Sequence, residues 1–411
     1  MEDLQGIGET ERGCVGRWIL NKKRELKNRK SKKSGKDKSL NIAVLGHKRI
    51  PSREGGIEVV VGELGTRMVR DGNQVTCYNR MGHHTAGAEF DPVKRDTYHG
   101  IMLKNIFTID YLGLAAVTSS ICASFAAAFG NYDIVHIHAE GTAFMCWLPK
   151  IMGKKVVVTV HGLDHQRAKW GRFASAYIMM GEKSAVRFAD EIIVLSKGIQ
   201  QYFMRNYGRK TAFIPNGVSR PEIQKADLIR EKWRLEKDGY ILFLGRIVPE
   251  KGVKYLIEAF RKVGTDKKLV IAGGSSDTDV FLEESKRQAK EDGRIIFTGF
   301  VQGRTLEELY SNAYIYALPS DLEGMPLSLL EAMSYGNCCL VSDIPECTEV
   351  IEDKAVVFQK SNVDDLRGKL QLLCDDEIAV QKYKNSASEF ICRKYDWDRT
   401  AAQTVAIYKE L

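Results

Sequence analysis

PSDLEGMPLSLLE, residues 319–331, is the stretch on which the interpretation of this 411-residue chain rests. It follows a short apolar run at 315–318, and its Pro and Gly residues separate that run from a second apolar segment with helical spacing. The stretch therefore predicts a buried strand, a loop at its carboxyl end and a helix that begins near Pro326. Glu331 comes roughly two helical turns after Glu323, so both carboxylates can face one pocket.

The alternation of short apolar runs and helix-spaced segments continues on both sides of this stretch. It is typical of parallel sheets with crossover helices. Helices are expected, for example, at 57–70 and 170–188, and strands at 41–45, 74–78, 134–138, 156–160, 191–195, 240–244, 268–271, 295–298, 315–318 and 338–341. We therefore predict an α/β fold of two facing, doubly wound, Rossmann-like domains that bind ligands where their strands end.

The length and the sequence IPNGV, residues 214–218, predict where the domains divide. A single core stops growing at about 250–300 residues, so this chain should hold two. Pro and Gly at 214–218 interrupt the alternation and mark the boundary. We expect an extension at 1–38, a first domain at 39–217 and a second domain at 218–393, with a final amphipathic helix at 394–411 that belongs with the first domain.

Composition excludes several classes of protein. The chain is 44% hydrophobic and 28% charged, as expected of a globular protein. Its nine cysteines form no CxxC pair, which argues against a zinc knuckle or a disulfide framework. The first 16 residues are acidic and contain no apolar segment of the kind found in signal peptides. We therefore expect a cytoplasmic protein.

The net charge of +8 is concentrated near the N-terminus. Residues 17–38 contain eleven Lys or Arg and two acidic residues, whereas residues after 38 carry only about +2. The body of the protein is therefore not a nucleic-acid-binding surface. The basic run is interpreted as a solvated, disordered tail, or as a segment attracted to an anionic membrane leaflet.

Residues 111–130 contain no charged side chain and are about as long as a membrane span. They are rich in Ala and Ser and run directly into the strand-like sequence YDIVHIH at 132–138. A buried or half-buried helix is therefore expected. The alternatives are a span or a helix that lies on the membrane surface.

Two loops after predicted strands could hold an anion. The first contains Gly55 and Gly56 and opens a helix whose N–H groups and dipole favour a phosphate, although Gly-Gly is also an ordinary turn signal. The spacing does not fit GxGxxG, which argues against a nicotinamide cofactor. The second loop carries Arg246 and Lys251, which can neutralise a diphosphate or simply be solvated.

The stretch at 319–331 adds acceptors for hydroxyl groups to these anion sites. Carboxylates such as Glu323 and Glu331 accept bidentate hydrogen bonds from the vicinal hydroxyls of a sugar. Between them, a helix entry offers free N–H groups to a phosphate. This entry consists of Gly324, Met325, Pro326 and Leu327.

Residues 40–411 resemble the retaining GT-B glycosyltransferases grouped as family 4. The resemblance rests on the E-x7-E pair and on FLGRIVPEKG at 243–252, IPNGV at 214–218, TVHGLD at 159–164 and REGGIE at 53–58. The first half is most similar to bacterial enzymes of capsule and exopolysaccharide assembly, including rhamnosyltransferases. The extension at 1–38 matches nothing in this pattern.

The resemblance implies a role for each candidate residue. Glu331 would bind the nucleotide ribose, and Glu323 the hydroxyls of the donor sugar. Arg246 and Lys251 would hold the diphosphate, which Gly56 would approach from the other domain. His161 would contact the transferred sugar near the reacting centre, although a histidine at a strand end can also be purely structural.

The expected reaction transfers a sugar from a nucleotide-diphosphate sugar, such as dTDP-rhamnose or a UDP-hexose, to an acceptor hydroxyl with retention. No metal and no other cofactor is expected, because Arg246 and Lys251 stabilise the leaving diphosphate. The alternatives are a nucleotide-sugar epimerase or hydrolase on the same fold, and a non-catalytic subunit that binds nucleotide sugar.

The expected acceptor is a saccharide, either free or linked to a polyprenyl lipid, and no nucleic-acid partner is expected. A lipid-linked acceptor would bring the first domain to the inner face of the plasma membrane. Three features favour peripheral contact there: the basic run at 17–38, the uncharged helix at 111–130 and the basic aromatic stretch at 166–170.

Overall fold

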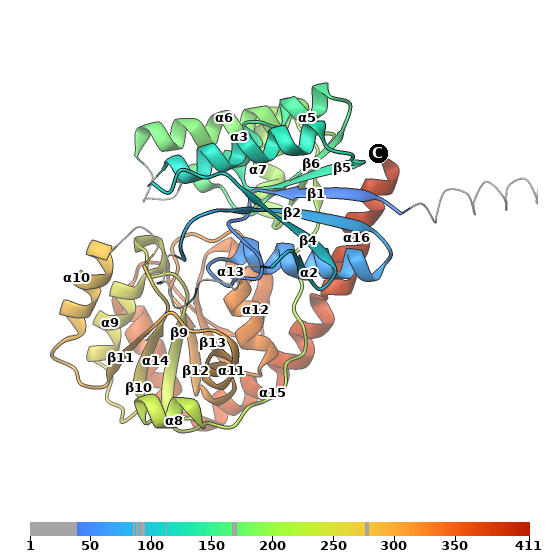
Figure 1. The fold of residues 1–411 in the computed structure, drawn as a ribbon. Helices are drawn as coiled ribbons and strands as arrows, with labels where there is room; N and C mark the ends of the chain where they lie inside the picture. The colour runs from blue at the N-terminus through green and yellow to red at the C-terminus, as the bar shows by residue number, and fades with distance from the viewer. Residues whose placement is uncertain are drawn as a thin grey trace, which may run out of the picture. The chain divides into compact units, whose positions relative to one another are not determined.

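Two largely parallel β-sheets, each alternating with helices along the chain, make up the part of the protein that the structure describes (Figure 1). The computed structural model describes residues 39–84, 87, 90, 95–111, 113–166, 171–275 and 279–411. By their contacts, residues 41–411 form one unit. The predicted extension at 1–38 lies outside the described residues.

The first sheet has the strand order β3-β4-β2-β1-β5-β6-β7-β8, and only the β3–β4 pair in it is antiparallel. Its strands are β1 (Asn41–Leu45), β2 (Gln74–Arg80), β3 (Thr97–Tyr98), β4 (Ile101–Ile106), β5 (Ile134–His138), β6 (Lys155–Val160), β7 (Glu191–Val194) and β8 (Ala212–Phe213). Its helices are α2 (Gly56–Arg70), α3 (Leu114–Phe129), α4 (Glu140–Ala143), α5 (Trp147–Ile151), the 3₁₀ turn η2 (Asp164–Gln166), α6 (Arg172–Phe188) and α7 (Lys197–Tyr207).

The second sheet has the strand order β11-β10-β9-β12-β13-β14 and is parallel throughout. Its strands are β9 (Tyr240–Leu244), β10 (Lys268–Ala272), β11 (Ile295–Gly299), β12 (Ile315–Leu318), β13 (Cys338–Ser342) and β14 (Val356–Phe358). Its helices are α8 (Leu228–Trp233), η3 (Pro249–Lys251), α9 (Val253–Arg261), α10 (Asp279–Ala289), α11 (Gly303–Asn312), α12 (Leu327–Ser334), α13 (Pro345–Ile351), α14 (Val363–Asp375) and α15 (Glu377–Lys394).

Strand order reverses once in each sheet, between β1 and β5 and between β9 and β12. The second sheet therefore has the Rossmann order, and its reversal point is where such sheets bind ligands. Strands at these reversals are buried on both faces, which explains why they appear in the sequence as continuous apolar runs. The prediction of two doubly wound α/β units is confirmed.

All ten predicted strands are present, and their ends differ from the predictions by at most two residues. Four further strands, β3, β4, β8 and β14, were not predicted. β3, β8 and β14 are short strands at the edges of the sheets, and β4, next to an edge, is largely exposed. β3, β8 and β14 are only two or three residues long, and β4 is interrupted by polar side chains at 104 and 105, so each gives a weaker sequence signal than the predicted strands.

The final helix, α16 (Trp397–Glu410), leaves the second sheet and packs on α2 of the first (Figure 1). Its start is capped by Asp396, whose side chain accepts from the Arg399 N–H at 2.8 Å. Near its end, the Tyr408 hydroxyl lies 2.5 Å from Nδ1 of His136 in the centre of β5. The predicted return of this helix to the first domain is therefore observed.

Helix α3 is half-buried, as predicted for residues 111–130, but its two faces are reversed from the usual pattern. The buried face carries small and hydroxyl side chains, namely Ser119, Ser120, Ala123, Ser124, Ala127 and Ala128. The exposed side chains include Leu114, Ile121, Phe125 and Phe129. Among the described residues, no helix is both long and apolar enough to cross a membrane.

The contact of α16 with β5 predicts a measurable loss of stability in Tyr408→Phe. Removal of the hydroxyl leaves Nδ1 of the buried His136 without its partner, and an unsatisfied buried acceptor costs about 1–3 kcal/mol. Urea unfolding should show this decrease, whereas Tyr111→Phe at an exposed tyrosine should match the wild type. Equal midpoints for all three proteins would contradict this role for α16.

Candidate donor site

Glu323 and Lys251 meet where β9 and β12 end. Lys251 Nζ donates to Glu323 Oε1 at 2.5 Å, and Ser320 Oγ donates to the same oxygen at 2.6 Å. The side chain of Glu323 is only 8% exposed and that of Lys251 only 13%, so water screens the attraction between the two charges weakly. The fold thus joins two predicted site residues that lie 72 positions apart in sequence.

Gly252 allows the loop of Lys251 to approach the loop of Glu323 this closely. Its φ is +66°, and a Cβ at this position would lie 1.9 Å from the carbonyl oxygen of Pro319. A side chain here would clash with backbone, which cannot move aside as a flexible side chain could.

Glu331 lies on α12 and is held from two directions. Arg53, from the loop before α2, donates to Oε1, and the Tyr310 hydroxyl donates to Oε2 at 3.1 Å. The ring of Tyr335 stacks on that of Tyr310 with centroids 5.2 Å apart. The carboxylate raises the pKa of Arg53, mainly through its charge. Glu331 therefore connects α12 to a loop of the first sheet.

The two helix N-termini predicted to hold phosphate lie beside each other. Helix α2 begins at Gly56 after an extended Gly55, and α12 begins at Leu327 after Pro326. A Cβ on Gly56 would lie 3.3 Å from Leu327 Cδ1. The first N–H donors within α12 are those of residues 329 and 330, which both bond the carbonyl of Pro326, so the two amides before them face outward from the helix end.

Gly324 is in backbone contact with His161 of the first sheet. A Cβ on Gly324 would lie 1.6 Å from the carbonyl oxygen of His161 and 3.0 Å from the Cα of Gly162. Only glycine allows this approach. The loop after β12 and the loop after β6 are therefore held against each other at the position of the predicted catalytic histidine.

His161 belongs to a row of three histidines. Its Nε2 lies 3.0 Å from Nδ1 of His138, and His136 contacts Thr159 Oγ1 through Nε2 at 2.7 Å. Burial lowers the pKa of His136 to about 3 and that of His138 well below its usual value. Both rings are therefore neutral at neutral pH, and a neutral, buried imidazole orients His161.

Arg246, the other predicted cation, comes two residues after the end of β9 and is half-buried on the loop that also carries Lys251. The start of this loop is fixed by the Gly245 N–H, which donates to the carbonyl of Ala272 at 3.0 Å. Both cations therefore lie at the reversal point of the second sheet. Cations, carboxylates and helix N-termini at one point suit a ligand with both phosphates and vicinal hydroxyls.

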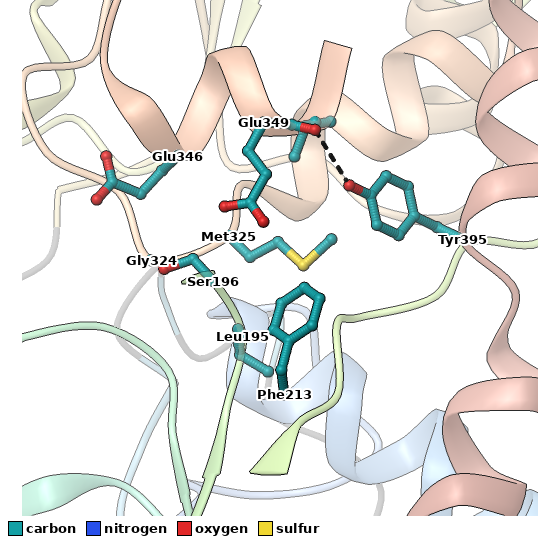
Figure 2. Close-up of a pocket in the computed structure, with 9 residues that line it drawn as sticks. Leu195, Ser196, Phe213, Gly324, Met325, Glu346, Glu349 and Tyr395 are labelled. Carbon is teal, nitrogen blue, oxygen red and sulfur yellow. Dashed lines mark hydrogen bonds between the residues drawn. The ribbon is translucent and has the colours of Figure 1, made fainter. Parts of the chain in front are cut away.

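A small pocket lies beside Gly324 and Met325, and Figure 2 shows its lining. The side chain of Met325 points into it, and Met325 Sδ accepts from the Asn216 N–H at 3.1 Å. Around it lie Leu195, Ser196, Phe213, Glu346, Glu349, Val350 and Tyr395. Burial raises the pKa of Glu346. The side chain of Met325 thus fills space between the two sheets.

Sequence reasoning did not assign Arg53, Tyr310, His136 or His138 to the site. Arg53 was part of the REGGIE motif, and its position before a glycine pair at a helix start was an available signal. His136 and His138 are two residues apart in a predicted strand, so the sequence indicated that their side chains lie on the same face of the sheet. Tyr310 had no sequence signal, because only the fold brings α11 beside α12.

Two family models match the chain. The model described as Glycosyltransferase Family 4 matches residues 54–220, and that described as Glycosyl transferases group 1 matches residues 225–390. The matches follow the two sheets and together extend over most of the chain. The protein is therefore an enzyme, a glycosyltransferase of the GT-B group 1 and family 4 type that acts on nucleotide sugars.

Relatives and solved structures agree with this assignment. An uncharacterised glycosyltransferase of Methanocaldococcus jannaschii is 26% identical, covering 90% of this chain and 98% of that protein. A UDP-Gal:alpha-D-GlcNAc-diphosphoundecaprenol alpha-1,3-galactosyltransferase of Escherichia coli is 25% identical, covering 64% of this chain and 71% of the relative. Sucrose-phosphate synthase of Thermosynechococcus elongatus has the same fold, with a TM-score of 0.76 at 20% identity over 90% of this chain and 98% of that one.

The contact of Gly324 with His161 predicts that Gly324→Ala separates the two loops. Because the added Cβ would overlap the His161 carbonyl, we expect turnover of nucleotide sugar to fall by on the order of 10²-fold, as when a reacting group is misplaced by about 1 Å. The control is Gly368→Ala in α14, where a Cβ meets nothing within 4 Å. Wild-type turnover in a folded Gly324→Ala protein would contradict the prediction.

Proposed function

We propose that the protein transfers a sugar, with retention, from a nucleotide-diphosphate sugar to a saccharide carried on a polyprenyl diphosphate, in the assembly of a surface polysaccharide. The observation that carries the donor half of this proposal is the Lys251–Glu323 pair at the β9–β12 reversal point, with Arg246 on the loop of Lys251 and Glu331 on the helix after Glu323. The acceptor half is supported by the surface of α3 and by the Escherichia coli relative, whose acceptor is a diphosphoundecaprenol-linked sugar. A dTDP-rhamnose or UDP-hexose donor fits this class.

In this proposal each candidate residue contacts one part of the donor. Glu331 accepts from the ribose hydroxyls, and Arg53 and Tyr310 hold its carboxylate in place. Glu323 accepts from hydroxyls of the sugar. Lys251 and Arg246 bind the diphosphate together with the amides at the starts of α2 and α12.

The proposed chemistry is attack by the acceptor on the same face from which the diphosphate leaves. The leaving phosphate oxygen accepts the acceptor's proton, and Arg246 and Lys251 stabilise the charge that develops on the diphosphate. His161, oriented by the neutral His138, contacts the transferred sugar. With two cations and two helix N-termini on the diphosphate, transfer requires no divalent ion there.

Glu331→Gln is expected to weaken binding of the nucleotide at least ~10-fold, because hydrogen bonds to charged groups contribute about 1.5–3 kcal/mol. Titration calorimetry with UDP and dTDP measures this, and Glu389→Gln at an exposed glutamate of α15 is the control. Arg246→Ala should instead lower kcat by on the order of 10²-fold.

These assays are run in EDTA. A requirement for added Mg²⁺ or Mn²⁺ would contradict the proposed role of the cations. Equal nucleotide affinity in Glu331→Gln and the wild type would contradict the ribose assignment. Product analysis without an acceptor separates transfer from the alternatives, since free sugar would indicate a hydrolase and an altered nucleotide sugar an epimerase.

The acceptor side of the proposal rests on α3 and its neighbours α5 and α6, which cover one face of the first sheet (Figure 1). Exposed large apolar side chains gather there: Leu114, Ile121, Phe125 and Phe129 on α3, Ile151 and Met152 at the end of α5, and Phe173 and Met180 on α6. We call this set the α3 surface. Since α3 has its small and hydroxyl side chains inside and its large apolar ones outside, an apolar environment is the one that suits it.

A lipid bilayer is the occupant that fits the α3 surface. Exposed Arg172, Lys183 and Arg187 on α6 add positive charge suited to anionic headgroups. Beneath α3, a small pocket is lined by Ser119, Ser120 and Ala123 of that helix together with Gly46, His47, Tyr78, Arg80 and Thr142. The predicted contributions of 1–38 and of 167–170 lie outside the described residues.

The α3 surface predicts that the protein sediments with vesicles that contain phosphatidylglycerol. Each Lys or Arg near an anionic surface contributes about 1 kcal/mol, so high salt and deletion of residues 1–38 should each weaken binding. Phe125→Glu combined with Phe129→Glu should also reduce it, without loss of transfer to a soluble acceptor analogue.

The matched control is Val280→Glu combined with Ile378→Glu, at two exposed apolar side chains on α10 and α15. Both double variants add the same charge. If they bind vesicles equally well, or if the wild-type protein does not bind at low salt, the membrane part of the proposal is wrong.

A further inference from the structure

Two buried glutamates and a half-buried histidine, none with an assigned role in the donor site, converge on one point. Glu140 begins α4, His165 lies in η2 and Glu182 lies in the middle of α6. One oxygen or nitrogen atom from each lies within 4.8 Å of the others. Helix α4 follows β5 and η2 follows β6, so the cluster lies near the carboxyl ends of these two strands of the first sheet.

The protein holds one oxygen of each carboxylate and leaves the other without a partner. The Asp164 N–H donates to Glu140 Oε2 at 2.9 Å, while the hydroxyls of Tyr202, at 3.0 Å, and Tyr207 donate to Glu182 Oε1. In the described part of the chain, Glu140 Oε1, Glu182 Oε2 and His165 Nδ1 are buried and have no hydrogen-bond partner. Buried polar atoms without partners are rare, and here three of them face one another.

The spacing suits two ligands of a common ion. His165 Nδ1 lies 3.5 Å from Glu182 Oε2 without forming a hydrogen bond. Two ligands bound tetrahedrally to Zn²⁺ at about 2.1 Å would lie roughly 3.4 Å apart. The tyrosine and amide donors on the outer oxygens correspond to the second shell that orients metal-ligating carboxylates.

The charge of the cluster also requires a counterion or a proton. Glu140 is 1% exposed and Glu182 is fully buried. Two adjacent carboxylates in this setting either share a proton or bind a cation, and the ring nitrogen of His165 favours a transition metal over Mg²⁺ or Ca²⁺.

We propose that Glu140, His165 and Glu182 bind a divalent transition-metal ion of the Zn²⁺ type. The ion would fasten η2 to α4 and α6. Since His165 lies four residues after His161, this fixes the loop whose carbonyl contacts Gly324. The ion's role is structural, which is compatible with a diphosphate site that uses no metal.

The test is metal binding by the full-length protein, independent of sugar transfer. After dialysis against a chelator, calorimetry with Zn²⁺ alone should show one tight site, and the thermal midpoint should rise on its addition. His165→Gln and Glu182→Gln should each weaken binding by on the order of 100-fold and remove the thermal shift. His99→Asn, at an exposed histidine outside the cluster, should bind as the wild type does.

Two results would overturn the proposal. One is a wild-type protein that binds Zn²⁺ no better than His165→Gln does. The other is a His165→Gln protein that is as stable as the zinc-loaded wild type without any metal, as expected if the two glutamates only share a proton. If Glu182→Gln fails to fold, His165→Gln still decides the question, because its amide preserves a polar side chain in a position only half-buried. The donor assignments are untouched by either result.

Discussion

The contact between the backbone of Gly324 and the carbonyl of His161 is the constraint on which the candidate site depends. It connects the loop after β12 to the loop after β6 without an intervening side chain, so Glu323 and the histidine row are held at fixed positions relative to each other. Arg53 reinforces this connection through Glu331, and the contact of Gly56 with Leu327 brings two helix N-termini together nearby. Because these contacts are short, the loops and helix starts that they join have few alternative positions.

Much of the fold could be predicted, because strands buried on both faces appear as continuous apolar runs between turn residues. The strands at 41–45, 134–138, 240–244 and 315–318 have the predicted bounds. The edge strands could not be predicted in this way, since β4 is partly exposed and β8 is only two residues long. The α3 helix was predicted as half-buried, but its inverted faces could not be read from composition, which does not say which side of a helix the sheet covers.

Some residues of the candidate site could likewise be predicted from the sequence, and others could not. Glu323, Arg246, Lys251 and His161 were predicted as site residues because each lies in a recognisable motif in a loop after a strand, and Glu331 because it lies in the helix that follows such a loop. Tyr310, His136 and His138 support those residues through contacts between elements that are distant in sequence, and local patterns do not reveal such contacts. Glu140 and Glu182 show the limit most clearly. One looks like an ordinary helix start and the other like a surface-helix glutamate, yet both are buried against His165.

The return of α16 to the first sheet has a consequence for synthesis on the ribosome. His136 is made early, in the centre of β5, but its partner Tyr408 follows only after the whole second sheet has been translated. While the second sheet is translated and folds, the side of α2 that binds α16 therefore stays exposed. Until α16 is made, the first sheet lacks its last helix even after the second sheet has folded. Docking of α16 therefore completes the first sheet only at the end of synthesis.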